Sequence, residues 1–113
     1  MTNKKPNEKT PSERQANVIY EMVDCICDRL PYVVLKQYDQ NWNEENEELI
    51  VELTFNRGTN VYKISINWYG VIKSYSNKIP KHMLVDISNG ISEGYLKEIF
   101  KEMRSQGINK NDF

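Results

Sequence analysis

Two neighbouring segments of the chain, residues 48–55 and 62–68, alternate between apolar and polar side chains. In the first segment the odd-numbered positions are apolar and only Ile50 interrupts the polar set, whereas in the second the even-numbered positions are apolar. A period of two is typical of a half-buried strand. Residues 56–60 between the segments, Asn-Arg-Gly-Thr-Asn, tolerate left-handed backbone, so the sequence predicts an antiparallel hairpin.

One register of this hairpin, in which Phe55 pairs with Tyr62, places all of its apolar side chains on a single face. That face holds Leu49, Val51, Leu53, Phe55, Tyr62, Ile64, Ile66 and Trp68, with Leu49 opposite Trp68. The other face presents Glu48, Ile50, Glu52 and Thr54 beside Lys63, Ser65, Asn67 and Tyr69. Because a sheet with one apolar face must bury it against a second layer, the rest of the chain has to supply that layer.

The first predicted covering element is a helix near the N-terminus. Its apolar residues recur at spacings of three and four: Ile19, Met22, Val23, Ile26 and Leu30. Pro11 suits the first helical position, with Thr10 or the competing Ser12 as cap. The helix should end before Pro31, because the residue ahead of a proline disfavours helical geometry.

The second predicted covering element is a helix over residues 93–105, capped by Ser92 and stopped by Gly107. Its apolar stripe holds Leu96, Ile99, Phe100 and Met103. Residues 32–35 and 71–75 favour further strands, and residues 82–87 fit either an edge strand or a loop over the core. We therefore predict an α+β fold: an antiparallel sheet of three to four strands with an N-terminal and a C-terminal helix packed on one face, in the order α-β-β-β-(β)-α.

The length of 113 residues suits one domain, which we expect to span residues 10–107. Residues 1–9 have the composition of a disordered tail, and residues 108–113 should fray. The net charge of -1 gives no global basic field for nucleic acid. No apolar run approaches the roughly 20 residues of a spanning helix, and the N-terminus lacks a signal peptide's hydrophobic stretch, so we expect a cytoplasmic protein without membrane contact.

No motif in the sequence indicates catalysis or a cofactor. Cys25 and Cys27 lie two apart on the predicted helix and point to nearly opposite sides, so they suit neither a disulfide nor a shared metal ion. His82 is the single histidine and has no triad partners nearby. The glycines form no phosphate-binding motif. We therefore expect no cofactor, no metal and no enzymatic activity.

The most unusual residue is Trp42, because it lies in the most polar and acidic segment of the chain. Such a ring either packs against its own domain or contacts a partner protein, and both alternatives stay open. Four of the seven tyrosines are assigned to the core or its edge: Tyr20, Tyr32, Tyr62 and Tyr75. The predicted contact residues lie in this acidic segment and on the sheet: Tyr38, Asp39, Trp42, Glu44, Glu45, Glu47, Glu48 and Tyr69.

This pattern favours a non-catalytic binding protein that occupies a basic surface on a partner, for example a nucleic-acid-binding enzyme. Phage and mobile-element inhibitors of host defence, including anti-CRISPR proteins, often have this size and acidity, as do bacterial immunity proteins. The comparison is one of type, without a shared motif. A homodimer stays open as well.

The alternative hypothesis is nucleic-acid binding, because the order α-β-β-β-α resembles that of double-stranded RNA-binding domains, with Pro31 and Tyr32 where their first strand begins. Such domains carry a lysine cluster at the start of the last helix. This chain has Ser-Glu-Gly-Tyr there, at residues 92–95, and Lys97 and Lys101 come only later. Nucleic acid is therefore the less favoured partner.

Overall fold

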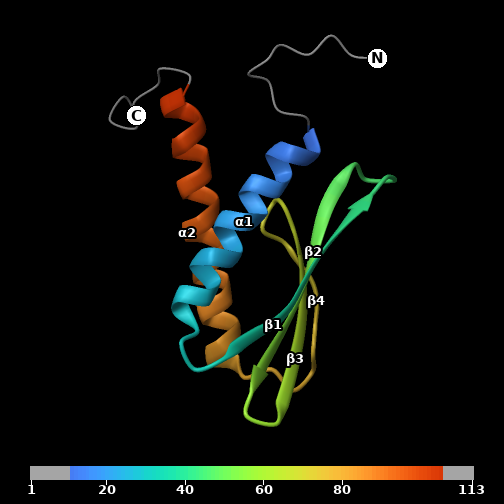
Figure 1. Cartoon of the computed structure of the whole chain (residues 1–113), viewed down its shortest axis with the longest axis vertical. Coiled ribbons are helices and arrows are strands. Elements are labelled where there is room, and N and C mark those ends of the chain that lie inside the picture. The colour runs from blue at the N-terminus through green and yellow to red at the C-terminus, as the bar shows by residue number, and fades with distance from the viewer. Residues whose placement is uncertain (1–10, 106–113) are drawn as a thin grey trace.

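A four-stranded antiparallel sheet covered on one face by two helices forms the protein (Figure 1). The structure is a computed structural model that describes residues 11–105, with side chains from residue 13. Its elements are α1 (Pro11–Arg29), β1 (Val34–Asn43), β2 (Glu48–Arg57), β3 (Asn60–Asn67), β4 (Ile72–Tyr75) and α2 (Lys81–Ser105). The strands lie in the order β1-β2-β3-β4. The predicted α+β fold is confirmed, while the two predicted tails, the Thr10 cap and the Gly107 stop lie outside the described residues.

The β2–β3 hairpin has the predicted register. Phe55 pairs with Tyr62, and the next inward pairs are Leu53–Ile64 and Val51–Ile66. Seven of the eight predicted apolar side chains are buried, and the eighth, that of Trp68, is half-buried against the core. The connection is tighter than predicted, because only Gly58 and Thr59 separate the strands and Gly58 takes a positive φ of 61°.

The predicted Leu49–Trp68 pair does not form, because β3 ends one residue earlier, at Asn67. There the chain turns: the Gly70 N–H donates to the Asn67 carbonyl at 3.0 Å. Gly70 has a φ of 85°, a conformation that favours glycine. A Cβ at this position would also lie 2.7 Å from the Ile91 side chain of α2, so the turn packs tightly under that helix.

The second helix differs most from its prediction. Residues 82–87 are neither an edge strand nor a loop, since α2 already begins at Lys81, with the Pro80 carbonyl accepting from the Met83 and Leu84 N–H groups. Ser92 is consequently in mid-helix and caps nothing. The predicted stripe is wrong for Leu96, which is 52% exposed, while Ile99, Phe100 and Met103 are half-buried. The buried stripe is Met83, Ile87, Gly90, Ile91, Gly94 and Glu98.

Two glycines of this stripe bring the helix backbones into direct contact. A Cβ on Gly90 would lie 2.6 Å from the Ile26 Cα, and one on Gly94 would lie 2.4 Å from the Met22 Cα. Small residues four apart on one face allow such an approach. The helices run antiparallel, with Arg29 of α1 donating two hydrogen bonds to Glu93 of α2, at 2.9 and 3.1 Å.

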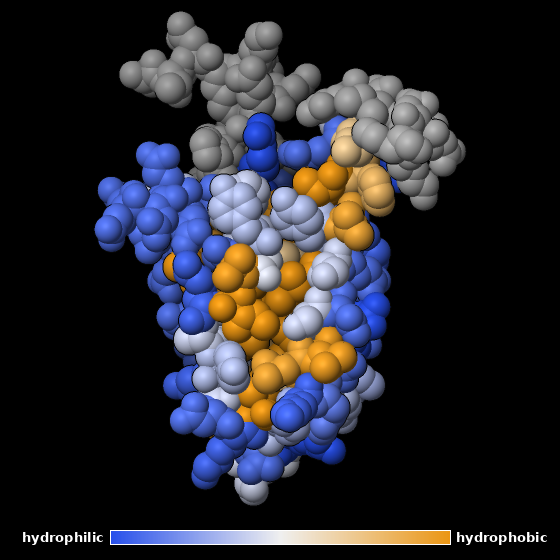
Figure 2. Space-filling view, turned by 180° about the vertical axis from the view of Figure 1, so that it is seen from behind, coloured by the Kyte–Doolittle hydropathy of each residue, from blue (hydrophilic) through white to orange (hydrophobic). Residues whose placement is uncertain are grey.

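The helical layer leaves apolar side chains uncovered beside it. Viewed from behind, the molecule carries a band of hydrophobic surface along its middle (Figure 2). On β4 and the turn before it, Val71 and Tyr75 are exposed, as is Val85 on α2. Tyr75, assigned to the core or its edge, is instead exposed, because the helices do not reach over this edge strand.

The close helix contact predicts that Gly94→Ala changes stability in the opposite direction from the usual glycine-to-alanine substitution in a helix. Alanine normally stabilises a helix by about 1 kcal/mol relative to glycine, but Gly94→Ala should destabilise the protein by about 2–3 kcal/mol, because its methyl group meets the α1 backbone. Thermal or urea unfolding measures the change. Ser92→Ala, at an exposed position of the same helix, is the matched control and should leave stability equal or slightly higher. A stabilising Gly94→Ala would contradict the close helix contact.

Candidate binding surface

The acidic segment around Trp42 is mostly strand rather than loop. Strand β1 runs to Asn43 and pairs with β2 along its whole length, with Trp42 opposite Leu49 and Asp39 opposite Glu52. The predicted loop is wrong because β2 pairs with the backbone of this polar segment along one side, which outweighs its poor intrinsic strand preference. A single irregularity at Lys36 interrupts the pairing.

The loop shrinks to a short turn that connects β1 and β2, with Glu44, Glu45 and Glu47 all exposed. The Asn46 N–H donates to the Asn43 side chain at 3.2 Å, and Glu47 takes a positive φ of 50°. Among residues 11–105, none of these three carboxylates forms an ion pair, whereas Glu21, Glu93 and Glu102 on the helices all do. The turn is thus a concentration of uncompensated negative charge, which we call the acidic turn (residues 44–47).

A buried glutamine of α1 holds this turn in place. The Gln15 side chain is 5% exposed; its Oε1 accepts from the Leu49 N–H at 2.6 Å, and its Nε2 donates to the Glu47 carbonyl at 3.1 Å. The clamp spans the residue with positive φ and fixes the start of β2 against the helix. Sequence reasoning missed Gln15, although its position one turn before Ile19 in the apolar stripe marks a buried polar side chain with partners.

Trp42 lies beside the acidic turn on the helix-facing side of β1. Its side chain is 40% exposed, so part of the ring is folded back and part is open to a partner. Tyr38 faces the same way and is half-buried against the core, and burial raises the pKa of its phenol. The Gln40 side chain donates to the Tyr38 hydroxyl and fixes its orientation.

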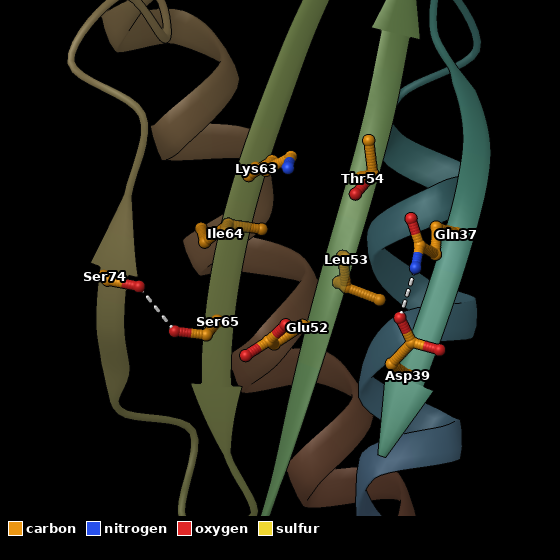
Figure 3. Close-up of a pocket in the computed structure, with 9 residues that line it drawn as sticks. All are labelled: Gln37, Asp39, Glu52, Leu53, Thr54, Lys63, Ile64, Ser65 and Ser74. Carbon is orange, nitrogen blue, oxygen red and sulfur yellow. Dashed lines mark hydrogen bonds between the residues drawn. The ribbon is translucent and has the colours of Figure 1, made fainter. Parts of the chain in front are cut away.

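Asp39 points to the opposite, open face of the sheet, where it accepts a hydrogen bond from Gln37 (Figure 3). Together with Glu52 and the hydrogen-bonded pair Ser65–Ser74, it lines a shallow polar hollow of about 270 Å³. Asp39 therefore does not share a face with Tyr38 and Trp42. The open face has the predicted polar character here.

The prediction that Glu48 is an exposed contact residue is wrong. This carboxylate is 5% exposed, because Asn67 donates to its Oε2 at 3.1 Å and the Lys73 ammonium lies 3.5 Å from its Oε1. Asn67 is buried as well and accepts from the Tyr69 and Val71 N–H groups. These contacts fasten the turn before β4 to the start of β2, so the role of Glu48 is structural.

Tyr69 projects from the β3–β4 turn, which lies at the same end of the sheet as the acidic turn (Figure 1). It is exposed and stacks on Trp68, with ring centroids 4.2 Å apart. The structure thus brings Trp42, Glu44, Glu45 and Glu47 together at one end, with Tyr69 at that end but on another turn. Tyr20, assigned to the core from sequence, is instead exposed on α1.

Within the described residues, no group of three or more histidine, cysteine or acidic side chains could hold a metal ion. Neither helix in this part of the chain has the length and apolarity needed to cross a membrane. Comparisons of the chain with protein-family models, curated proteins and solved structures give no match. Any functional argument therefore depends on the surface itself.

The glutamine clamp generates a test of how the acidic turn is held. Gln15→Leu should lower the free energy of unfolding by about 2 kcal/mol, since it leaves the buried Leu49 N–H without an acceptor. Amide exchange at Leu49 should accelerate more than exchange at Leu53, further along the same strand. Arg14→Ala, which removes a surface ion pair of 3.6 Å, should change stability by less than about 0.5 kcal/mol. Uniform acceleration along β2 would contradict a local clamp.

Proposed function

We propose that the protein is a small non-catalytic binding protein that places Trp42 and the acidic turn on a basic surface of a partner protein. The observation that carries this proposal is the clustering of three exposed carboxylates in the turn, none of which forms an ion pair within the described residues, whereas Glu21, Glu93 and Glu102 of the helices are paired. Charges that stabilise the fold are compensated within it. Charges without a structural role are available to a partner.

The geometry of the hairpin adds to this argument. The Gln15 clamp orders the turn before any partner arrives, which reduces the conformational entropy lost on binding. A half-exposed tryptophan next to charged side chains is a common centre of an interface, with the charges steering association and the ring contributing most of the affinity.

The matching partner surface is a basic one, such as the nucleic-acid-binding cleft of an enzyme. An inhibitor of host defence encoded by a phage or a mobile element, of the anti-CRISPR type, would act by filling such a cleft. An immunity protein would act similarly on a toxin. The support for these two classes is the charge and shape of the hairpin alone.

Nucleic acid itself is the weaker alternative. Of the seven lysines in the described residues, three are engaged with carboxylates, and the other four, Lys36, Lys63, Lys78 and Lys81, are exposed on four separate elements or loops. The ammonium of Lys73 lies near Glu48, that of Lys97 lies 3.6 Å from Glu93, and Lys101 contacts Glu21. Binding phosphate there would require breaking these contacts. The three carboxylates of the acidic turn, by contrast, lie within four consecutive residues and form no ion pair in the described part of the chain.

A charge reversal in the acidic turn tests the proposal. Glu45→Lys should weaken capture of a protein partner from a nuclease-treated lysate by about tenfold or more, equivalent to ~1.4 kcal/mol, with a larger effect at low salt. Asp28→Lys changes the net charge equally at an exposed site in the last turn of α1 and should leave capture unchanged. Equal losses in both variants would mean that only net charge matters. If the protein instead recovers nucleic acid, and this recovery is lost on nuclease treatment, the nucleic-acid-binding alternative is favoured.

Removing the Trp42 ring tests separately how much it contributes to stability and how much to partner binding. Trp42→Ala should cost about 1–2 kcal/mol of stability, since part of the ring is buried opposite Leu49, and should weaken partner binding by about 2 kcal/mol or more. Thermal unfolding and titration with the captured partner measure the two effects. Tyr75→Ala, which removes an exposed ring from the other edge strand, is the control and should keep full affinity. Unchanged binding by Trp42→Ala would assign the ring to the core alone.

A further inference from the structure

The outer edge of β1 is open. Strand β1 is the first strand of the sheet and spans ten residues, and no other strand of the described chain pairs with its outer side. Edge strands present unpaired N–H and C=O groups that can accept a further strand. Natural proteins often block such edges with lysine and bulges, and Lys36 sits at the one irregularity of β1. Beyond it, from Gln37 to Asn43, the strand is regular.

An apolar groove runs along this edge on the helix side. It has a volume of about 260 Å³ and is lined by Tyr20, Val23, Asp24, Cys27, Leu35 and Tyr38. The groove arises because α1 packs on β2 and leaves β1 partly uncovered. Tyr20 at the groove is 68% exposed, so its ring is accessible to a segment that enters the groove.

The other side of the same edge is acidic. On the open face, Asp39 of β1 and Glu52 of β2 are cross-strand neighbours at the polar hollow, which Lys63 of β3 also lines, and the Glu52 carboxylate points toward Ser65 of β3 (Figure 3). Both carboxylates are exposed and form no ion pair in the described part of the chain. A strand added next to β1 would therefore meet an apolar groove on one side and negative charge on the other.

We propose that β1 accepts an extended segment of the partner as a fifth strand, with alternating apolar and basic side chains. Side chains of a strand alternate between the two faces, so its apolar residues would enter the groove and its basic residues would face Asp39 and Glu52. This inference rests on the proposed function, since it specifies which part of a basic partner the protein holds. Backbone pairing supplies affinity, and the two unlike faces supply specificity.

A second copy of this chain is the less suitable occupant. If two β1 strands paired, the open face at the junction would receive Gln37, Asp39 and Asn41 of the other copy. This set contains no cation to compensate Asp39 and Glu52, and the only lysine of β1, Lys36, lies at the irregularity. Charge complementarity therefore favours a basic partner segment.

The probe for this proposal is an eight-residue peptide of alternating valine and lysine with blocked ends, titrated into the full chain by calorimetry. Two further peptides carry N-methyl groups on every valine or on every lysine. Because the N–H groups of alternate residues point to the same edge of a strand, only one methylated peptide should lose binding, by tenfold or more, while the other keeps it. No binding of the parent peptide, or equal binding of the two methylated peptides, would overturn the proposal.

Protein variants locate the peptide on the molecule. Tyr20→Ala and Asp39→Asn should each weaken the peptide about fivefold, because they alter the groove and the acidic face respectively, whereas Tyr75→Ala should not. Loss of binding in Tyr75→Ala alone would place the peptide on the β4 edge and overturn the assignment. Concentration-dependent dimerisation with protection of the β1 amides would also overturn it, because the second copy would then be the occupant.

Different results would contradict the strand addition and the proposed function. The peptide would pair with β1, which ends at Asn43, so Glu45→Lys outside this strand should leave peptide affinity within about twofold of the wild type. If the peptide fails to bind while Glu45→Lys still abolishes partner capture, the strand addition is wrong and the proposed function stands. If the peptide binds but capture is insensitive to Glu45→Lys, the proposed function is wrong instead.

Discussion

The direct backbone contact between α1 and α2 determines how the sheet is covered. Because Gly90 and Gly94 leave no room for side chains against Ile26 and Met22, the helical layer is narrow. A narrow layer over four strands protects the middle of the sheet, where β2 and β3 carry the best-buried residues, and reaches the outer strands only in part. The open groove beside β1 and the hydrophobic band in Figure 2 are both consistent with this spacing.

Sequence reasoning predicted those parts of the fold that local periodicity determines. The register around Phe55 and Tyr62 followed from strict alternation, and the end of α1 at Arg29 followed from Pro31. It failed where tertiary contacts override local preference. The first turns of α2 look β-like because of residues 83–87, yet they form helix after Pro80. Gly90 and Gly94, for which the sequence alone indicated no role, are the residues that permit helix packing.

The sequence predicted which kinds of side chain the candidate surface carries, but not the structural contacts that hold them there. Trp42 and the glutamates of the turn are exposed at one place, as expected from a polar segment with one large ring. Their presentation depends on Gln15, 32 residues away from the carbonyl that it contacts, and the burial of Glu48 depends on Asn67 and Lys73. Such long-range polar contacts leave little trace in one sequence, because a buried glutamine and an exposed one look alike.

If a partner binds the acidic turn as proposed, the contact of Gln15 with the start of β2 would link the lifetime of that complex to the folding of the first helix. Gln15 lies near the N-terminal end of α1, where helices open most readily. Each opening of that end would release the Glu47 carbonyl and let the turn lose its positive-φ conformation. A partner bound to the turn would in return slow this opening, so fraying of the helix and dissociation of the complex would be two readouts of a single equilibrium.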